Sequence, residues 1–287
     1  MLLKTVLLTC CQRFNGERTF SAIYHLLQGK RSIQTVQDAH AYRLERFLGI
    51  YPTLSMQAFK ERIAHCKHAN LIETAALTDK CLLTKEGRAK QKQLAKQYPL
   101  TYFHGHAFYK QDAIFWKRLV LLIQVLTNKQ MDNRSYIPVI DDPHILNWLK
   151  NRYKTMKGNV QNALQKIYDE LSKILHLISD EEAYIFVSRL TGYRHFGMSY
   201  GQLANHFQRS IEDIQLIHVA TIHFMLLHIS KHKQSFPFLT WLIDDFEKAK
   251  TMTESAQKSY QLLKKGYSVE QIASLRNLTI HTITNIS

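Results

Sequence analysis

The sequence predicts a mainly α-helical protein with one small β-hairpin. Glycine and proline are scarce, with 10 and 5 in 287 residues, which disfavours a sheet architecture rich in turns. Apolar residues make up 45% of the chain and recur mostly at helical spacing. We expect three domains: a winged-helix-like unit over 1–97, a helical domain over 98–247, and a truncated helix-turn-helix over 248–287.

The order of elements in the first domain is typical of a winged helix. Asn15-Gly16 and Gly29 are residues that end helices, and Lys30-Arg31-Ser32 opens a third helix. Two short strands around Thr78-Asp79-Lys80 are expected to form the wing. The helices expected before these strands cover 6–14, 18–28, 30–40 and 59–68.

The third helix and the wing hold the side chains that we expect to contact DNA. Glutamine pairs with adenine edges and arginine with guanine, whereas cations on a wing suit phosphates. The domain has sixteen Lys and Arg against seven Asp and Glu, which favours a polyanionic partner. The alternative is a winged helix that docks proteins. The candidate contacts are Lys30, Arg31, Gln34, Gln37 and His40 on the helix, and Lys80, Lys85 and Arg88 on the wing.

The central domain contains a second spacing like that of a helix-turn-helix. Two helices, capped by Ser199 and Ser210 and joined at Gln208-Arg209, are similar in layout to the promoter-reading region of sigma factors. The second of them begins with Glu212-Asp213, and acidic residues at a helix N-terminus repel phosphate. We therefore interpret this unit as structural or protein-binding. The helices expected in the domain cover 112–127, 145–155, 159–179, 181–191, 199–207 and 210–229.

Residues 260–287 have the apolar spacing of a third helix-turn-helix. Gly266 is expected to end its first helix, and Ser268 with Gln271 forms a capping box for the second. A helix capped by Thr279 follows, and the chain ends partway into it at Ser287. The residues expected to face inward are Ile272, Ala273, Ile280 and Ile283, and those expected to face DNA are Arg276, His281, Thr282 and Asn285.

We expect no catalytic site, cofactor or metal in this chain. The sequence contains neither Gly-x4-Gly-Lys-Ser/Thr nor Gly-x-Gly-x-x-Gly, the two glycine-rich motifs that bind phosphate groups. The carboxylates at Asp141-Asp142 and Asp244-Asp245 are interpreted as helix caps. Two groups of residues could be considered as metal ligands: His65, Cys66, His68 and Cys81, and the pair His228 and His232. Neither group has a second pair of ligands at the spacing of a known metal site. The least favoured hypothesis is a metal-dependent nucleic-acid enzyme that uses Asp141, Asp142 or the histidines.

The cysteines and the apolar runs indicate a soluble cytoplasmic protein. Cys10, Cys11, Cys66 and Cys81 lack zinc-knuckle spacing and are expected to be free and mostly buried. The longest apolar run, 119–123, is far below the roughly 20 residues of a membrane span.

Two stretches of sequence resemble a known family. The first is Asn15-Gly-Glu-Arg-Thr19, followed by Tyr24-His-Leu-Leu-x-Gly29-Lys30 and Ser32-x-Gln34-Thr35-x-Gln37-Asp38-Ala-His40. This pattern resembles the N-terminus of YpbB-like proteins of low-GC Gram-positive bacteria. The second lies near the C-terminus and resembles the helix-turn-helix found after the core of RecQ-type helicases. Its matching residues are Gly266, Ser268, Ile272, Ala273, Arg276, Leu278, Thr282 and Ile283.

The resemblance implies an accessory protein that is encoded beside a RecQ-type DNA helicase and acts with it in repair or recombination. We expect a non-enzymatic DNA-binding adaptor whose main DNA contact is Lys30–His40, because the terminal recognition helix is cut short. The alternative is a sequence-specific transcription regulator, which the winged helix and the sigma-like spacing favour. The oligomeric state is left open by the sequence.

Overall fold

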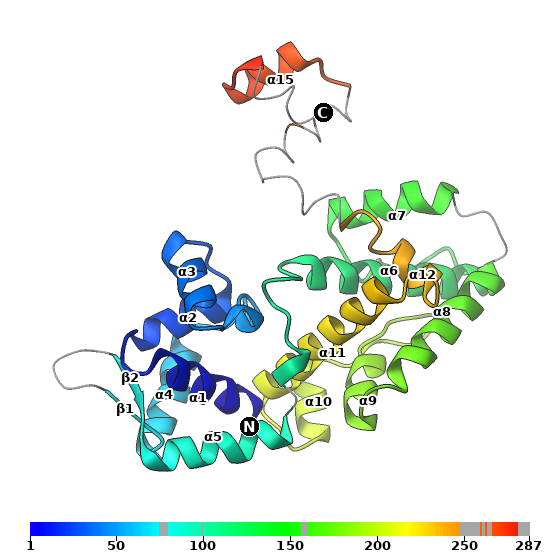
Figure 1. Ribbon diagram of the computed structural model, residues 1–287. Helices are drawn as coiled ribbons and strands as arrows, with labels where there is room; N and C mark the ends of the chain where they lie inside the picture. The colour runs from blue at the N-terminus through cyan, green and yellow to red at the C-terminus, as the bar shows by residue number, and fades with distance from the viewer. Residues whose placement is uncertain are drawn as a thin grey trace. The chain divides into compact units, whose positions relative to one another are not determined.

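The structure, a computed structural model, describes residues 1–74, 80–98, 100–155, 160–246, 259, 262 and 266–280. Within these ranges the chain is mainly helical with a two-stranded antiparallel sheet, which confirms the predicted fold class (Figure 1). The chain forms two compact units, Met1–Phe236 and Pro237–Ser287. The domain boundaries expected at 97/98 and 247/248 stay predictions.

The first unit begins with the N-terminal module, which we define as α1 to α5. Its strands are β1 (Ile72–Thr74) and β2 (Cys81–Leu83), with Ile72 opposite Leu83. An isolated bridge between Thr19 and Lys80 places the α1–α2 connection beside the hairpin. The helices are α1 (Leu2–Phe14), α2 (Phe20–Gln28), α3 (Ile33–Ala41), the 3₁₀ turn η1 (Glu45–Phe47), α4 (Met56–His68) and α5 (Lys85–Gln97).

The predicted ends of the first two helices are confirmed by backbone geometry, whereas the third helix begins at Ile33 and not at Lys30. Asn15 (φ 44°) and Gly29 (φ 77°) adopt the left-handed conformation that stops α1 and α2. The Ser32 hydroxyl accepts a hydrogen bond from the Thr35 backbone N–H at 3.3 Å and so caps α3. The helix directly before β1 is α4. α3 precedes α4 in the chain and is separated from it by the 3₁₀ turn η1.

The expectation that Lys85 and Arg88 lie on the wing is wrong. β2 ends at Leu83, and the Thr84 hydroxyl accepts a hydrogen bond from the Gly87 backbone N–H at 2.9 Å. Because this bond caps a helix, the chain enters α5 at Lys85 instead of continuing the hairpin. Lys85 and Arg88 are therefore exposed residues of the first turns of α5.

The second half of this unit is helical and is organised around α11. The Ser199 and Ser210 caps are confirmed, since each hydroxyl accepts a backbone N–H of its helix. A single apolar core joins the N-terminal module to residues of α9, α10 and α11, including Ile185, Leu203 and Ile217. The elements are η2 (Leu100–Tyr102), α6 (Gln111–Gln130), α7 (Pro143–Thr155), α8 (Val160–Leu175), α9 (Asp180–Ser188), α10 (Tyr200–His206) and α11 (Ile211–Lys231).

Among the described residues, α11 is the one helix that is long and apolar enough to cross a membrane. However, 72% of its most apolar 18-residue window is buried inside the protein. This burial is typical of a core helix.

The second unit is described in part, and contains α12 (Pro237–Trp241) and α15 (Val269–Arg276). The predicted capping box of Ser268 and Gln271 is confirmed, as is the positive φ of Gly266, 87°. Ile272 and Ala273 are buried, as expected, and are packed by Leu262, Val269 and Leu278. The inward orientation expected for Ile280 is wrong, because Ile280 is 51% exposed while Leu278 packs on this small core. Ile283 lies outside the described residues.

Candidate nucleic-acid interface

The residues expected to read DNA on the third helix share one exposed surface. We call this the α3 surface, and it consists of Lys30, Arg31, Gln34, Gln37 and His40. The opposite side of α3 is buried through Thr35, Asp38 and Ala39. α3 is held to the module by an ion pair between the Arg18 guanidinium and the Asp38 carboxylate, at 2.8 Å. The helix thus exposes mainly polar side chains together with Ile33, which is 78% exposed, and buries its smaller residues.

An aromatic ring supports the basic start of the α3 surface. The Arg31 guanidinium lies 5.0 Å from the centre of the Tyr109 ring, and the Lys110 ammonium lies 5.5 Å from it. The Tyr109 hydroxyl donates a hydrogen bond to the Gly29 carbonyl at 2.9 Å, which fixes the ring beside the α2–α3 turn. Lys110 is exposed and therefore adds a cation here that the sequence analysis did not identify. It was missed because it is remote from Arg31 in the sequence.

His40, at the other end of the α3 surface, is already engaged. Its Nδ1 lies 3.2 Å from a carboxylate oxygen of Glu45, and its ring packs edge-on against His106 at 5.1 Å. An acidic partner at this position weakens contact with phosphate. The basic end of the surface is therefore its N-terminal end, near Lys30 and Arg31.

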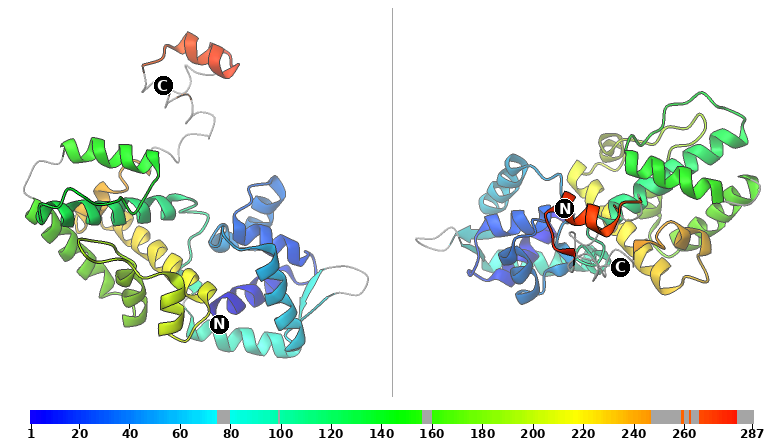
Figure 2. Two further views of the ribbon diagram at one scale, coloured as in Figure 1. Left: turned by 180° about the vertical axis from the view of Figure 1, so that it is seen from behind. Right: turned by 90° about the horizontal axis from the view of Figure 1, so that it is seen from above.

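The structure does not gather all the expected N-terminal contacts on one surface. Figures 1 and 2 show α3 and α5 at opposite ends of the N-terminal module, so Lys85 and Arg88 lie far from the α3 surface. Lys80 is half-buried at the start of β2, where its backbone pairs with Thr19. Thr78 and Asp79, at the expected turn of the wing, lie outside the described residues.

In the second helix-turn-helix-like unit, the first turn of α11, where a recognition helix would contact DNA, packs against other helices of the protein. The Asp213 carboxylate, only 2% exposed as a residue, accepts a hydrogen bond from the Leu3 backbone N–H at 3.0 Å. The Glu212 carboxylate pairs with the Arg62 guanidinium of α4 at 2.8 Å. Because the first turn of α11 contacts α1 and α4, it is not free to enter a DNA groove. This geometry agrees with the structural interpretation of the unit.

A polar cavity of about 320 Å³ lies at this contact, between α1, α4 and the α10–α11 turn. Its arginines are neutralised at its edges, Arg62 by Glu212 and Arg209 by Glu181 at 2.7 Å. Lys4 adds one more cation, and the Asp213 carboxylate pairs with the Met1 amino group, whose pKa is lowered to about 5 mainly by burial. The cavity is therefore balanced in charge and does not form an anion site.

Of the DNA contacts expected in the second unit, only Arg276 lies within the described residues. The Arg276 guanidinium donates a hydrogen bond to the Ser259 hydroxyl within this unit, and the side chain is half-buried. Arg276 therefore stabilises the packing of α15. The other three expected contacts, His281, Thr282 and Asn285, lie outside the described residues.

Asp142 and the four cysteines, which are among the groups that could serve metal chemistry, are engaged in the fold. The Asp142 carboxylate caps the start of α7 through the His144 backbone N–H, and a hydrogen bond from Lys117 lowers its pKa. All four cysteines are free and buried, as expected, and burial raises the pKa of the Cys10 thiol. Over the described ranges, no group of three or more His, Cys, Asp and Glu side chains is placed to hold a metal ion.

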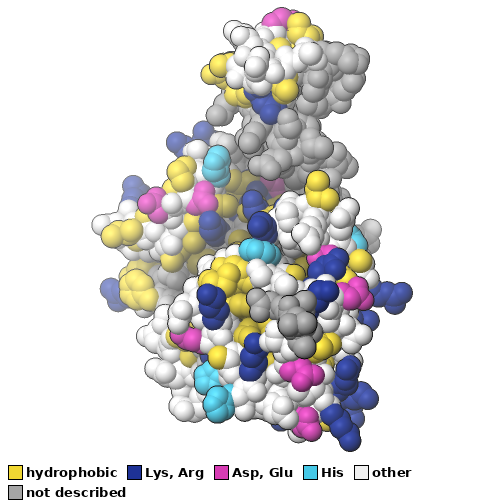
Figure 3. Space-filling model, turned by 90° about the vertical axis from the view of Figure 1, so that its left-hand side faces the viewer, with side chains coloured by type: hydrophobic (Ala, Val, Ile, Leu, Met, Phe, Trp, Pro, Cys, Tyr) yellow, Lys and Arg dark blue, Asp and Glu magenta, His cyan; other side chains and the backbone are white. Residues whose placement is uncertain are grey.

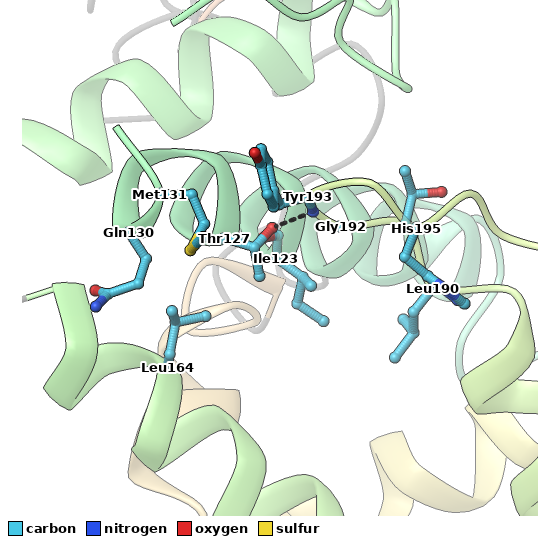
Figure 4. Close-up of a pocket in the computed structure, with 10 residues that line it drawn as sticks. Ile123, Thr127, Gln130, Met131, Leu164, Leu190, Gly192, Tyr193 and His195 are labelled. Atoms are coloured by element: carbon cyan, nitrogen blue, oxygen red, sulfur yellow. Dashed lines mark hydrogen bonds between the residues drawn. The ribbon is translucent and has the colours of Figure 1, made fainter. Parts of the chain in front are cut away.

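A second cavity, of about 330 Å³, lies in the helical part of the first unit (Figure 4). It is lined by α6, by Leu164 of α8 and by residues 190–193 and 195. The Thr127 hydroxyl accepts a hydrogen bond from the Tyr193 backbone N–H at 3.0 Å and holds this loop against α6. The lining contains no Lys, Arg, Asp or Glu, so the cavity offers no permanently charged side chain to a ligand.

Figure 3 shows how charge is distributed over one face of the protein. Lys and Arg side chains are scattered on it among uncharged and acidic side chains, and do not form one continuous basic field. On this face the net charge of +15 is thus spread over separate local groups of cations.

The chain is similar to one curated protein over nearly its whole length. It is 29% identical to Protein YpbB of Bacillus subtilis (strain 168) over 279 residues, which cover 97% of this chain and 78% of that protein. No protein-family model and no solved structure matches the chain.

Proposed function

The chain is a member of a YpbB-like family, and from this premise we propose that it is a non-enzymatic, DNA-binding accessory protein. In this proposal it acts in the cytoplasm with a RecQ-type DNA helicase in repair or recombination. The single observation that supports DNA binding is the α3 surface, where basic side chains just before one short helix and polar side chains on it are exposed together.

The chemistry of the α3 surface suits a duplex. Lys30 and Arg31 stand just before the N-terminus of α3, where the helix dipole and free backbone N–H groups also attract phosphate. Gln34 and Gln37 follow on the same exposed side, and a glutamine amide matches the donor and acceptor of an adenine edge. Cations that hold the backbone and amides that reach base edges are the two kinds of contact found in DNA-reading helices.

We expect charge reversal on the α3 surface to weaken DNA binding. In the variant Lys30→Glu/Arg31→Glu, two phosphate contacts become repulsive, so affinity for a random-sequence duplex at low salt falls by about tenfold or more. Fluorescence anisotropy with a labelled duplex measures the effect. The matched control Lys150→Glu/Lys154→Glu changes two exposed lysines of α7 and the same amount of charge, and its affinity should stay within about threefold of wild type. Equal affinities for the two variants would remove the α3 surface from the proposal.

The partnership with a helicase comes from the family resemblance and has its own test. Tagged protein is used to pull down the RecQ-type helicase of the same cell, with and without nuclease. Recovery after nuclease treatment is the expected result, because an adaptor contacts its partner directly. Absence of the helicase under both conditions contradicts the partnership and leaves DNA binding unaffected.

The two exposed glutamines of α3 also favour a second candidate, a sequence-specific transcription regulator. A regulator discriminates its site from random duplex by roughly 10³-fold or more at physiological salt. An accessory protein shows little sequence preference and a steep dependence on salt. Selection of bound sequences from a random pool followed by competition with random duplex distinguishes the two.

A further inference from the structure

A row of four cations runs along the solvent side of α5. At 100° per residue they fall within a sector about 80° wide, on the side of the helix opposite the buried Gly87, Gln91 and Leu94. The row is about 16 Å long, since its ends are separated by eleven residues at about 1.5 Å each. Its members, all exposed, are Lys85, Arg88, Lys92 and Lys96, which we call the α5 row.

The α5 row has no counter-charge in the part of the chain that the structure describes. None of its four side chains forms an ion pair or a hydrogen bond there, in contrast to Arg18 and Arg62, which are paired with carboxylates. Glu86 is the one acidic residue of α5, and it points elsewhere, toward the Asn70 amide 3.5 Å away. Like charges three and four residues apart destabilise a helix, so an external polyanion would relieve a repulsion that the protein leaves in place.

We propose that the α5 row binds the phosphate backbone of nucleic acid without regard to base sequence, at a site separate from the α3 surface. Lysine and arginine neutralise phosphates and release condensed counterions, which is the main source of sequence-independent affinity. The row offers cations at each turn of the helix and no pair of amides directed at bases. This inference rests on the proposed DNA-binding function and adds to it a second contact at the other end of the N-terminal module.

The test removes the four charges without changing the helix. The variant Lys85→Ala/Arg88→Ala/Lys92→Ala/Lys96→Ala keeps high helix propensity in α5, so its unfolding transition should match that of wild type. The control Lys150→Ala/Lys154→Ala/Lys166→Ala/Lys173→Ala removes four exposed lysines of α7 and α8 and has the same net charge. Affinity for a random-sequence duplex, and for one of its strands alone, is measured by anisotropy over a salt series.

We expect the α5 variant to bind at least tenfold more weakly at low salt, with a slope of log affinity against log salt reduced by roughly three for duplex. The control should keep nearly the wild-type slope. If the α5 variant and the control behave alike while charge reversal at Lys30 and Arg31 weakens binding, the α5 row is not a site and the proposed function stands. If wild-type protein binds neither probe, both the proposed function and this inference fail.

Discussion

Replacement of Gly87 by alanine is expected to lower the free energy of unfolding by about 3 kcal/mol. A Cβ atom at this position would lie 1.8 Å from the Leu71 carbonyl oxygen and 3.2 Å from a Leu83 methyl group. The carbonyl belongs to the backbone at the start of the hairpin and has no side-chain rotation with which to move away. The helix and hairpin would therefore separate, at a contact that positions α5. Chemical denaturation followed by circular dichroism measures the loss.

The matched control for this substitution is Gly201→Ala in α10. A Cβ at Gly201 meets only the Ser199 hydroxyl oxygen, at 3.8 Å, which is ordinary van der Waals contact. Alanine also has the higher helix propensity, so this variant should be neutral or more stable by up to roughly 1 kcal/mol. Two variants of equal stability would mean that α5 does not pack on Leu71 as described.

Acidification is expected to destabilise the protein through His218. This residue of α11 is 2% exposed, and burial, with a smaller contribution from Arg189, holds its pKa well below the usual 6.5. Its Nδ1 lies 3.0 Å from the Tyr200 hydroxyl, and its ring packs edge-on against Trp116 at 4.3 Å. The folded state thus keeps this imidazole neutral, whereas the unfolded state protonates it below about pH 6.5.

The loss of stability at low pH follows from this difference in proton binding between the folded and unfolded states. Stability from His218 is complete above pH 6.5 and is lost as the pH falls below that value, at up to about 1.4 kcal/mol per pH unit for one proton. Denaturation at several values between pH 7.5 and 5 should show the loss. The variant His218→Gln cannot titrate, so its stability should fall less steeply over this range. Residual pH dependence is expected from His104 and His25, whose pKa values burial also lowers. Parallel profiles for variant and wild type would contradict this role.

The helix ends were predictable because they depend on local chemistry. Gly29, Ser32 and Ser268 stop or start their helices through backbone conformation and through hydrogen bonds to residues three positions away. The structural role of the second helix-turn-helix-like unit was also predictable in outline, because Glu212 and Asp213 are unsuited to phosphate. Their actual partners, Arg62 and the Leu3 backbone, are far away in the sequence and depended on the tertiary fold.

α5 was the main element that sequence patterns did not predict. Residues 85–97 contain only three apolar side chains, so the helix has no apolar stripe and relies on the Thr84 cap and on contacts of Gly87, Gln91 and Leu94. As a result, Lys85 and Arg88 were assigned to the wing, and the remainder of the α5 row was not recognised. The place of Lys110 beside Arg31 was likewise set by tertiary contacts through Tyr109.

We propose that this protein binds DNA mainly through contacts with the phosphate backbone. The most direct test of this proposal is the affinity of the full wild-type chain for a random-sequence duplex over a range of salt concentrations. We expect binding at low salt, with log affinity falling linearly against log salt at a slope of about −5, since each of the six proposed phosphate contacts contributes about −0.9. Absence of binding at the lowest salt, or an affinity that does not change with salt, would contradict it.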